Sequence, residues 1–330
     1  MSNITIFQPR DGGLFVLLAD LLFDYDLANL ANTCNLFKQA TLPKFMFHVK
    51  RMKKWINGLP NVRTLHTYSK FIDLDLIIPC SKLTTLDLGH SITTDLTPLK
   101  HLEQLTDLDI SWHDRADIDL TPIGDLIKLR SLQMWSTNNS GFLWVQNLVN
   151  LEYLDISNNR LTTLDFLYPL KKLKSLIIWS CAVTNIKPLV SLTSLTRLDI
   201  SYNPLIVDVL DIWKLVNLEY LNISHCKLNI VDWIFRLVKL KVLDLSNNNI
   251  RGVSGLRFLT NLQVVYLSGN KIKSITCLGK LPKLKKISIC GTYVKSVSCL
   301  QSLPKLQEVR LIKDRTPDWE ILTPRVKVFG

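Results

Sequence analysis

The stretch Leu151-Glu-Tyr-Leu154-Asp-Ile156-Ser-Asn-Asn159 decides the fold, because its frame, LxxLxLxxN, restarts along most of the chain. The spacing is 22 residues in most cases, and a worn copy begins near Val62. Such self-similarity at a fixed period is typical of proteins built from stacked structural repeats. The clear copies begin at residues 83, 105, 129, 151, 173, 195, 218, 240, 262, 284 and 306.

The chemistry of one repeat predicts a short strand followed by a tight helical turn. Side chains alternate across a strand, so Leu154 and Ile156 point to one side, and Tyr153, Asp155 and Ser157 point to the other. In the second half of the repeat, apolar residues recur at every third position, which suits a tight helical turn. Stacking these units places the strands in one continuous parallel sheet, and the result is a curved solenoid.

Position nine of the frame carries an amide that is expected to satisfy backbone groups of the turn. Asn159, Asn203, Asn248 and Asn270 occupy this slot. Cys181 and Cys226 take the same slot in other repeats, so we expect small structural side chains rather than reactive thiols. The chain has seven cysteines and no CxxC pair, which favours reduced thiols over a disulfide framework.

Over residues 62–314 the frame resembles the leucine-rich repeats of the 22-residue internalin-type class, which is also found in a phosphatase-regulating subunit. The resemblance implies an α/β solenoid, a leucine-rich repeat horseshoe with a parallel concave sheet, over residues 58–314. A solenoid needs closed ends, because a terminal repeat exposes half of its core. We expect residues 315–330 to form the C-terminal cap, with these apolar residues: Trp319, Ile321, Leu322, Val326, Val328 and Phe329.

The segment before the repeats has the apolar spacing of helices. Its order of Leu18, Leu21 and Leu22, then Asp26-Leu27, Leu30, Thr33-Cys34 and Phe37-Lys38, resembles an F-box, although Arg10 and Asp11 stand where an F-box has Leu-Pro. The resemblance implies that residues 1–57 form a small helical module, completed by a connecting helix through the basic segment 44–55. The alternative is that these helices only cap the first repeat. The residues expected to meet the SCF adaptor, or to pack the motif, are Leu14, Leu17, Leu18, Leu21, Leu22 and Leu27.

The solvent-facing strand positions predict where a partner protein binds. Aromatic side chains at such positions expose large apolar surfaces to solvent unless a partner covers them. Protein interfaces often use such side chains as their main contacts. Packing of these rings on each other or on loops is the alternative, and a structural role is the alternative for the recurring aspartates. The predicted partner-binding residues are Trp112, Trp135, Tyr153, Asp155, Trp179, Asp199, Tyr202 and Tyr220.

The formal charge of +12 is unevenly placed: residues 1–70 carry +5, residues 271–330 carry +9, and the rest carry −2. A basic field over the whole protein is therefore absent, and we do not expect nucleic acid to be the primary partner. The sequence has no HExxH, no glycine-rich phosphate loop and no metal-ligand cluster, so we expect no enzyme activity, no cofactor and no metal. His113 beside Asp114 is expected to lie in a solvated loop.

These features predict a non-catalytic adaptor that holds a target protein on its concave face and presents it to a ubiquitin ligase. An alternative is a scaffold or structural protein, for example of a virus particle, and another is a phosphatase-regulating subunit. No apolar run is long enough for a membrane span, and no secretory signal is evident. We therefore expect an intracellular address in a eukaryotic cell; the pairing of modules resembles mosaic proteins of large DNA viruses and some protists.

Overall fold

The computed structural model describes residues 45–47, 63–67, 72–112, 118–206, 208–322 and 325–330. The chain divides into two compact units, Met1–Asn138 and Asn139–Gly330. The described residues of each unit form turns of the same repeat, in which a short strand is followed by a loop, a 3₁₀ helix and a return to the next strand. The predicted domain boundaries at residues 57 and 314 stay predictions.

In the first unit, parallel strands pair in the order of the sequence. The strands are β1 (Phe45–Phe47), β2 (Thr64–Thr67), β3 (Thr85–Asp87), β4 (Asp107–Asp109) and β5 (Ser131–Gln133). The 3₁₀ helices are η3 (Leu74–Ile77), η4 (Thr97–His101) and η5 (Thr121–Asp125).

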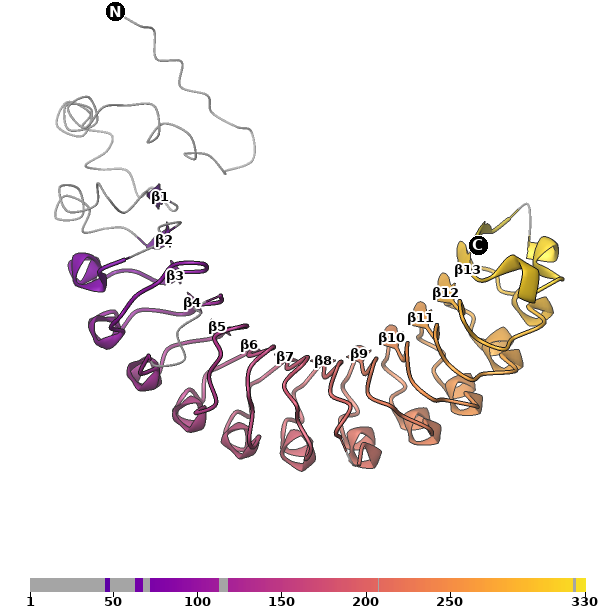
Figure 1. The fold of residues 1–330 in the computed structure, drawn as a ribbon, viewed down its shortest axis with the longest axis horizontal. Coiled ribbons are helices and arrows are strands. Elements are labelled where there is room, and N and C mark those ends of the chain that lie inside the picture. Colours follow the sequence, from indigo (N-terminus) through magenta and orange to yellow (C-terminus); the bar gives the residue numbers. More distant parts are fainter. Residues whose placement is uncertain (1–44, 48–62, 68–71, 113–117, 207, 323–324) are drawn as a thin grey trace, which may run out of the picture. The chain divides into compact units, whose positions relative to one another are not determined.

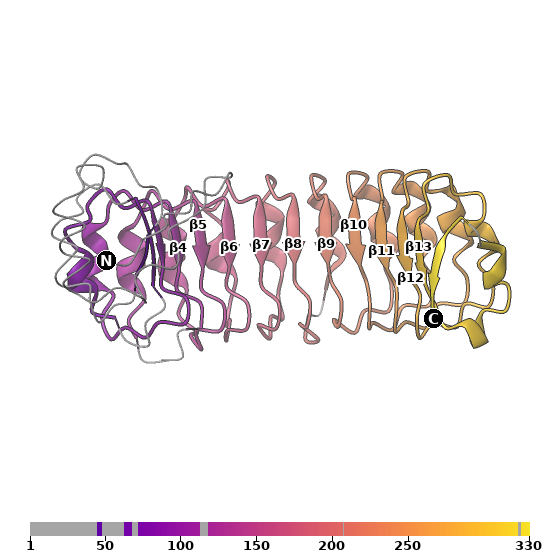
Figure 2. The ribbon, with the colours of Figure 1, turned by 90° about the horizontal axis from the view of Figure 1, so that it is seen from above.

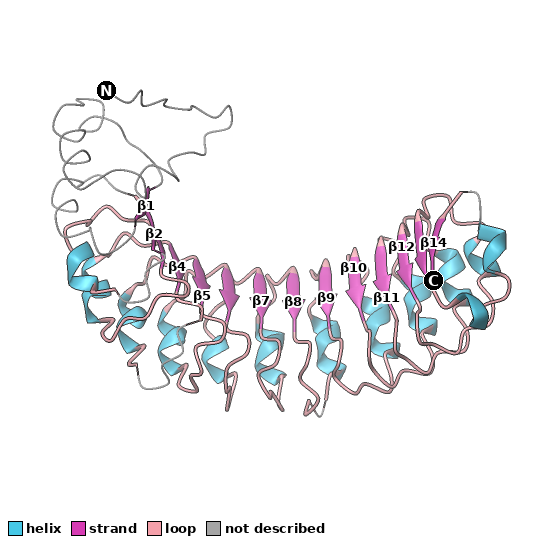
Figure 3. Cartoon of the chain, turned by 45° about the horizontal axis from the view of Figure 1, so that its top comes forward, coloured by secondary structure: helices cyan, strands magenta, loops and turns pink. Residues whose placement is uncertain are grey.

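The second unit continues the same pattern, with its 3₁₀ helices on the side of each turn opposite the strands (Figures 1 and 3). Seen along the sheet normal, its strands lie side by side (Figure 2). The strands are β6 (Tyr153–Asp155), β7 (Ser175–Ile177), β8 (Arg197–Asp199), β9 (Tyr220–Asn222), β10 (Val242–Asp244), β11 (Val264–Tyr266), β12 (Lys286–Ser288), β13 (Glu308–Arg310) and β14 (Lys327–Phe329). The 3₁₀ helices are η6 (Leu143–Asn147), η7 (Asp165–Leu167), η8 (Lys187–Ser191), η9 (Leu210–Lys214), η10 (Asp232–Arg236), η11 (Ser254–Phe258), η12 (Thr276–Lys280), η13 (Ser298–Leu300), η14 (Lys313–Arg315) and η15 (Trp319–Leu322).

The predicted strand register is confirmed. From β3 to β13 each strand occupies positions three to five of the frame, so that Leu198 pairs with Leu176 on one side and with Leu221 on the other. These leucines are fully buried, as are Leu154 and Ile156 in their own turn. The core is therefore a stack of leucine and isoleucine layers, each contributed by one repeat.

The asparagine slot at position nine holds neighbouring turns together. Asn203 is fully buried, and its Nδ2 donates to the carbonyl oxygens of Ile178, Ile200 and Ser201 at 2.8–3.0 Å. Its Oδ1 accepts from the backbone N–H groups of Cys181 and Val183, both at 3.0 Å. One amide thus satisfies five backbone groups in two turns. This confirms the expectation that the amide bonds backbone groups of the turn.

Many helices are preceded by a short polar side chain that accepts a hydrogen bond from the first helical turn. Asp95 Oδ1 accepts from the N–H of Thr97 at 2.7 Å, and Asn185 Oδ1 accepts from Lys187 at 3.0 Å. Thr163 acts in the same way toward Asp165. Such side chains favour local turns over extended backbone, so they fix where each 3₁₀ helix begins.

The edge of the first unit differs from the prediction. The connecting helix expected over residues 44–55 is wrong at Phe45–Phe47, where the backbone forms β1, parallel to β2. An unpaired sheet edge exposes a row of free N–H and C=O groups, and β1 satisfies that edge of β2. The other residues of the expected F-box-like module, 1–44 and 48–57, lie outside the described part of the chain.

At the other end, the residues expected to form a cap add a further strand. β14 pairs in parallel with β13, with Val328 opposite Val309. Leu322 is buried beneath it, whereas Ile321 and Phe329 remain substantially exposed. The segment therefore extends the sheet by one strand, and among the six residues named for the cap only Leu322 joins the buried core.

Candidate functional site

The aspartates at position five of the frame have a local role that the structure makes explicit. Oδ1 of Asp155 accepts from the N–H of Ser157 at 3.0 Å, and Oδ1 of Asp199 accepts from Ser201 at 3.0 Å. The same bond recurs in both units wherever an aspartate occupies this position. The carboxylate thus terminates the strand by satisfying an N–H that leaves the sheet ladder.

Burial makes two of these carboxylates harder to ionise. The pKa of Asp244 is raised mainly by desolvation, with a further contribution from the charge of Asp199. In the first unit, desolvation and the nearby Asp87 raise the pKa of Asp109 in the same way. In both cases the environment disfavours the charged form of the carboxyl group.

We expect Asp244→Asn to stabilise the protein at pH 7, because the amide keeps the acceptor without the buried charge. Asn222 already makes this bond, accepting from Ser224 at 3.1 Å. A raised folded-state pKa means that the unfavourable contribution is absent at low pH and develops as the pH rises through that pKa. Denaturant titrations should therefore show a larger advantage of Asp244→Asn at pH 7 than near pH 4. Asp244→Ala should instead lose about 1 kcal/mol, and a stable alanine variant would contradict this role.

Two turns lack the aspartate at position five and carry a tryptophan at position seven. Gln133 and Ile177 stand at position five of these turns, and Trp135 and Trp179 stand at position seven, where serine is common. Both indoles are half-buried, so each keeps an exposed portion. These turns thus lack the strand-terminating carboxylate and present a large aromatic side chain two residues later.

Position eight of the frame adopts a left-handed backbone that sequence reasoning missed. Trp112 has a φ of 60° and Tyr202 a φ of 56°, whereas Gly269 and Gly291 fill the same slot in later turns. A bulky residue in this region costs about 1–2 kcal/mol relative to glycine. The signal was available, because asparagine and glycine, which tolerate this conformation, recur in the slot. Backbone strain of this kind gathers at functional sites.

The aromatic and histidine rings of positions seven and eight form one cluster in each unit. In the first unit, the ring of His90 stacks on Trp112 at 5.4 Å, and Trp112 meets Trp135 edge-on at 4.6 Å. Trp112 is 43% exposed. We call these three residues the first aromatic cluster. His90 was not among the predicted residues, although it occupies the same position eight as Trp112.

The second aromatic cluster consists of Trp179, Tyr202 and His225, with Asn247 beside it. Tyr202 stacks on His225 at 4.0 Å with the rings 13° from parallel, and it meets Trp179 edge-on at 6.4 Å. Asn247 Nδ2 donates to Nε2 of His225 at 2.8 Å. Tyr202 is nevertheless 52% exposed, so the rings pack on each other and still present a broad apolar edge to solvent.

The two predicted tyrosines of position three lie on the strand face and join neither cluster. Tyr220 is half-buried beneath the guanidinium of Arg197, whose Cζ lies 3.6 Å from the ring centroid. Burial is the main cause that raises the pKa of its hydroxyl. Tyr153 is half-buried in β6. The predicted leucines 14–27 and the pair His113–Asp114 lie outside the described residues.

The cysteines of position nine substitute for the asparagine. Cys181 Sγ donates to the carbonyl oxygens of Ile156 and Trp179 at 3.3 and 3.4 Å, and Cys226 Sγ makes the equivalent contact with Ile200. Burial raises the pKa of Cys181 to about 12 and that of Cys226 to about 11. Both thiols are held protonated in the core and are poor nucleophiles.

Comparison with known proteins shows which repeat family this chain resembles. A family model described as leucine-rich repeats in two copies matches residues 149–186, 216–258, 238–281 and 260–301. The fold is that of a leucine-rich repeat protein. The solenoid with its parallel sheet is thereby confirmed. A comparison of the sequence with curated proteins gave no significant match.

Solved leucine-rich repeat structures resemble this chain closely in fold. The internalin InlF of Listeria monocytogenes is 24% identical, with a TM-score of 0.75 over 83% of this chain and 82% of that chain. A leucine-rich repeat protein of Leptospira interrogans is 19% identical, with a TM-score of 0.66 over 90% and 92%. The functional domain of Listeria monocytogenes InlJ, which includes a cysteine ladder, is 19% identical, with a TM-score of 0.63 over 83% and 69%.

The described residues contain neither a metal-binding group of side chains nor a membrane-spanning helix. No three His, Cys, Asp or Glu side chains there are grouped so that they would hold a metal ion. Among the same residues, every helix is too short or too polar to cross a bilayer. What the described surface does present is a set of exposed aromatic side chains on turns that are fixed by backbone pairing.

We expect Tyr202→Gly and Tyr202→Ala to differ in stability although both remove the ring. Glycine relieves the left-handed backbone, whereas alanine keeps the strain, so the glycine variant should be more stable than the alanine variant by about 1 kcal/mol. Thermal and denaturant unfolding of the two variants measures the difference. Equal stabilities would mean that the φ of 56° carries no strain.

Proposed function

We propose that this leucine-rich repeat protein is a non-catalytic interaction scaffold, and that the two aromatic clusters are its main partner-binding anchors. The supporting observation is the combination of exposure and strain at Trp112 and Tyr202. An aromatic residue that is only structural has no reason to occupy a left-handed position while remaining half-exposed. Rigid aromatic side chains lose little entropy on binding, and they dominate the binding energy of many interfaces.

The repeat scaffold suits this role because it holds the anchors without help from the partner. The strands beneath the second aromatic cluster are fixed by backbone pairing and by the asparagine slot, so its rings are already ordered before binding. Pre-organisation of this kind lowers the entropic cost of association. In this proposal, Asp155 and Asp199 act by shaping the strand ends beside the anchors, and Tyr153 and Tyr220 add contact area on the strand face.

Quantitative cross-linking of the whole chain tests the proposal, with Trp179→Ala/Tyr202→Gly compared against Tyr168→Ala. Tyr168 is 46% exposed and is the control aromatic residue outside the clusters. We expect proteins captured by the native chain to fall at least about tenfold with the double variant, and to be retained by the control. Equal capture by all three chains would refute the role of the second cluster.

The second candidate function is an F-box-type receptor that brings the bound target to a ubiquitin ligase inside a eukaryotic cell. It is favoured by the sequence of residues 18–38, with Leu14, Leu17, Leu18, Leu21, Leu22 and Leu27 as the adaptor contacts. The mechanism would be proximity, because tethering raises the effective concentration of the target. If the chain does not retain the purified SCF adaptor, the simpler scaffold, including a particle component or a phosphatase regulator, is the better account.

A further inference from the structure

The loops that follow four consecutive strands of the second unit carry an unusual charge pattern. We call residues 223–231, 245–253, 267–275 and 289–297 the strand-exit loops, because each runs from the end of a strand to the next 3₁₀ helix. These loops contain no aspartate or glutamate. Their basic residues, all exposed, are Lys227, Arg251, Lys271, Lys273 and Lys295.

None of these five cations makes an ion pair or a side-chain hydrogen bond with another described residue. Carboxylates that lie near the loops accept hydrogen bonds from backbone N–H and hydroxyl groups, not from these cations. Asp318 accepts from the N–H of Val297 at 3.0 Å and from the hydroxyl of Ser296. Asp244 accepts from Ser246 at 2.8 Å. The five cations therefore have no direct ion-pair partner in the part of the chain that the structure describes.

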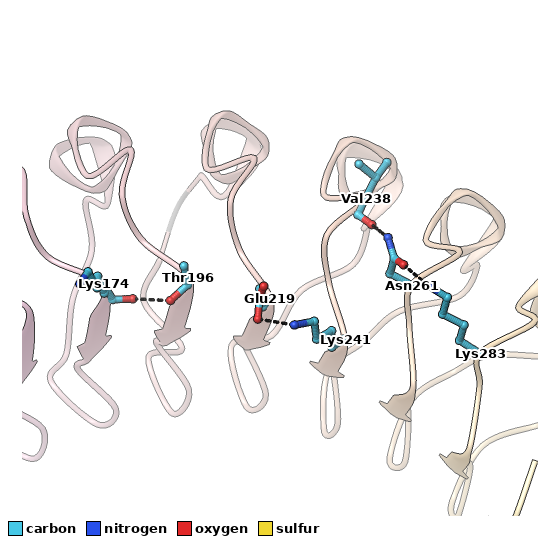
Figure 4. Close-up of polar contacts among 7 residues, drawn as sticks. All are labelled: Lys174, Thr196, Glu219, Val238, Lys241, Asn261 and Lys283. Carbon is cyan, nitrogen blue, oxygen red and sulfur yellow. Dashed lines mark hydrogen bonds and ion pairs between the residues drawn. The ribbon is translucent and has the colours of Figure 1, made fainter. Parts of the chain in front are cut away.

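The opposite edge, where the chain enters the strands, shows that this pattern is not a general property of the repeat. There Lys241 pairs with Glu219 at 2.7 Å, and Lys283 donates to Asn261 at 2.6 Å (Figure 4). Asn261 in turn donates to the carbonyl oxygen of Val238. Lys174 pairs with Glu152 at 2.6 Å. These three lysines of the strand-entry edge are thus bonded to a carboxylate or an amide oxygen, whereas the cations of the strand-exit loops have no such partner among the described residues.

The unpartnered cations continue the edge on which the second aromatic cluster lies. His225 belongs to the first strand-exit loop, and Lys227 follows it two residues later. A polyanion with stacking bases is a poor fit, because Tyr202 lies between Trp179 and His225, and His225 between Tyr202 and Asn247. The rings therefore already pack on one another, one pair edge-on and one pair stacked, whereas single-stranded nucleic acids use open ring faces.

We propose that the strand-exit loops bind an acidic polypeptide segment of the partner. The inference rests on the proposed function and specifies the charge of the ligand: aspartate or glutamate side chains lie along Lys227, Arg251, Lys271, Lys273 and Lys295, beyond the aromatic anchors. Charge complementarity at an exposed surface speeds encounter and selects the partner. Because the cations are exposed, the interaction weakens as salt shortens the screening length.

Fluorescence anisotropy with a labelled oligoglutamate peptide and the full chain tests this surface. The variant Lys271→Gln/Lys273→Gln is compared with Lys172→Gln/Lys239→Gln, which changes the net charge equally at the other edge, where the two lysines donate to Asn150 and Asn217. We expect the first variant to lose affinity about tenfold at low salt and the control to change by less than about twofold. Circular dichroism confirms that both variants are folded.

Three outcomes would overturn the inference. They are no binding of oligoglutamate at low salt, an equal loss in both variants, or tighter binding of a single-stranded oligonucleotide that disappears with Lys271→Gln/Lys273→Gln. The last result would assign the surface to nucleic acid. None of these outcomes affects the aromatic anchors, whose test uses Trp179→Ala/Tyr202→Gly, so failure of the charge inference and failure of the scaffold proposal are distinguishable.

Discussion

Replacing Asn203 with alanine is expected to cost about 3 kcal/mol of the free energy of unfolding. The amide satisfies three carbonyl oxygens and two N–H groups, and the side chain is fully buried. Alanine leaves these backbone groups without a partner in a site that excludes water. The cost of removing these backbone groups from water is then no longer offset by hydrogen bonds. The effect is therefore much larger than the loss of an exposed hydrogen bond.

Asn203→Cys provides a graded control, because other turns of this chain already use cysteine in the slot. A thiol keeps a weak donor to the carbonyl oxygens, as Cys181 does, but it lacks the acceptor for the N–H groups of Cys181 and Val183. Urea titrations should therefore place Asn203→Cys between the native chain and Asn203→Ala. A loss below about 0.5 kcal/mol for the alanine variant would show that water or backbone shifts replace the amide.

Leu198→Ala is expected to destabilise the protein by about 3 kcal/mol. Leu198 lies in the middle of β8, is fully buried, and pairs in register with Leu176 and Leu221. Truncation removes buried methyl groups and leaves a cavity that the neighbouring turns can fill only in part, because each turn is fixed by its own backbone ladder.

The loss at Leu198 should be local before it is global. In a repeat array each turn contacts only its neighbours, so a weakened turn opens before distant ones do. Hydrogen exchange should accelerate first in β7, β8 and β9. Ser194→Ala, an exposed change in the same repeat, should stay within about 0.5 kcal/mol of the native chain. Uniform acceleration over the whole chain would contradict this nearest-neighbour behaviour.

The repeat was readable from the sequence because its signal is redundant. Leu154, Ile156 and Asn159 recur at a fixed spacing. Strand alternation and the need to bond the buried amide determine whether each side chain faces the core or the solvent. The strand register and the tight helical turns follow directly. β1 was missed because its pairing depends on an open edge of β2, which is a tertiary property that local periodicity does not contain.

The candidate site was readable only in part. Solvent exposure of Trp112 and Tyr202 followed from the frame, but their left-handed backbone and the stacking of His90 and His225 depend on the geometry of the turn. Asp155 and Asp199 were named for their charge, whereas the structure shows that each terminates a strand. Sequence spacing places side chains on a face, but it does not show which local bond already engages them.

The hydrogen bonds that join neighbouring turns connect residues about one repeat apart, as from Lys241 N–H to Glu219 O and from Gln263 N–H to Lys241 O. A repeat therefore donates backbone N–H groups to the repeat before it and offers carbonyl oxygens at the same positions to the repeat after it. Excising or duplicating a whole number of repeats should leave all remaining joints matched. The number of repeats can therefore change without altering the joint between any two of them, so the length of such a sheet is independent of the structure of a single repeat.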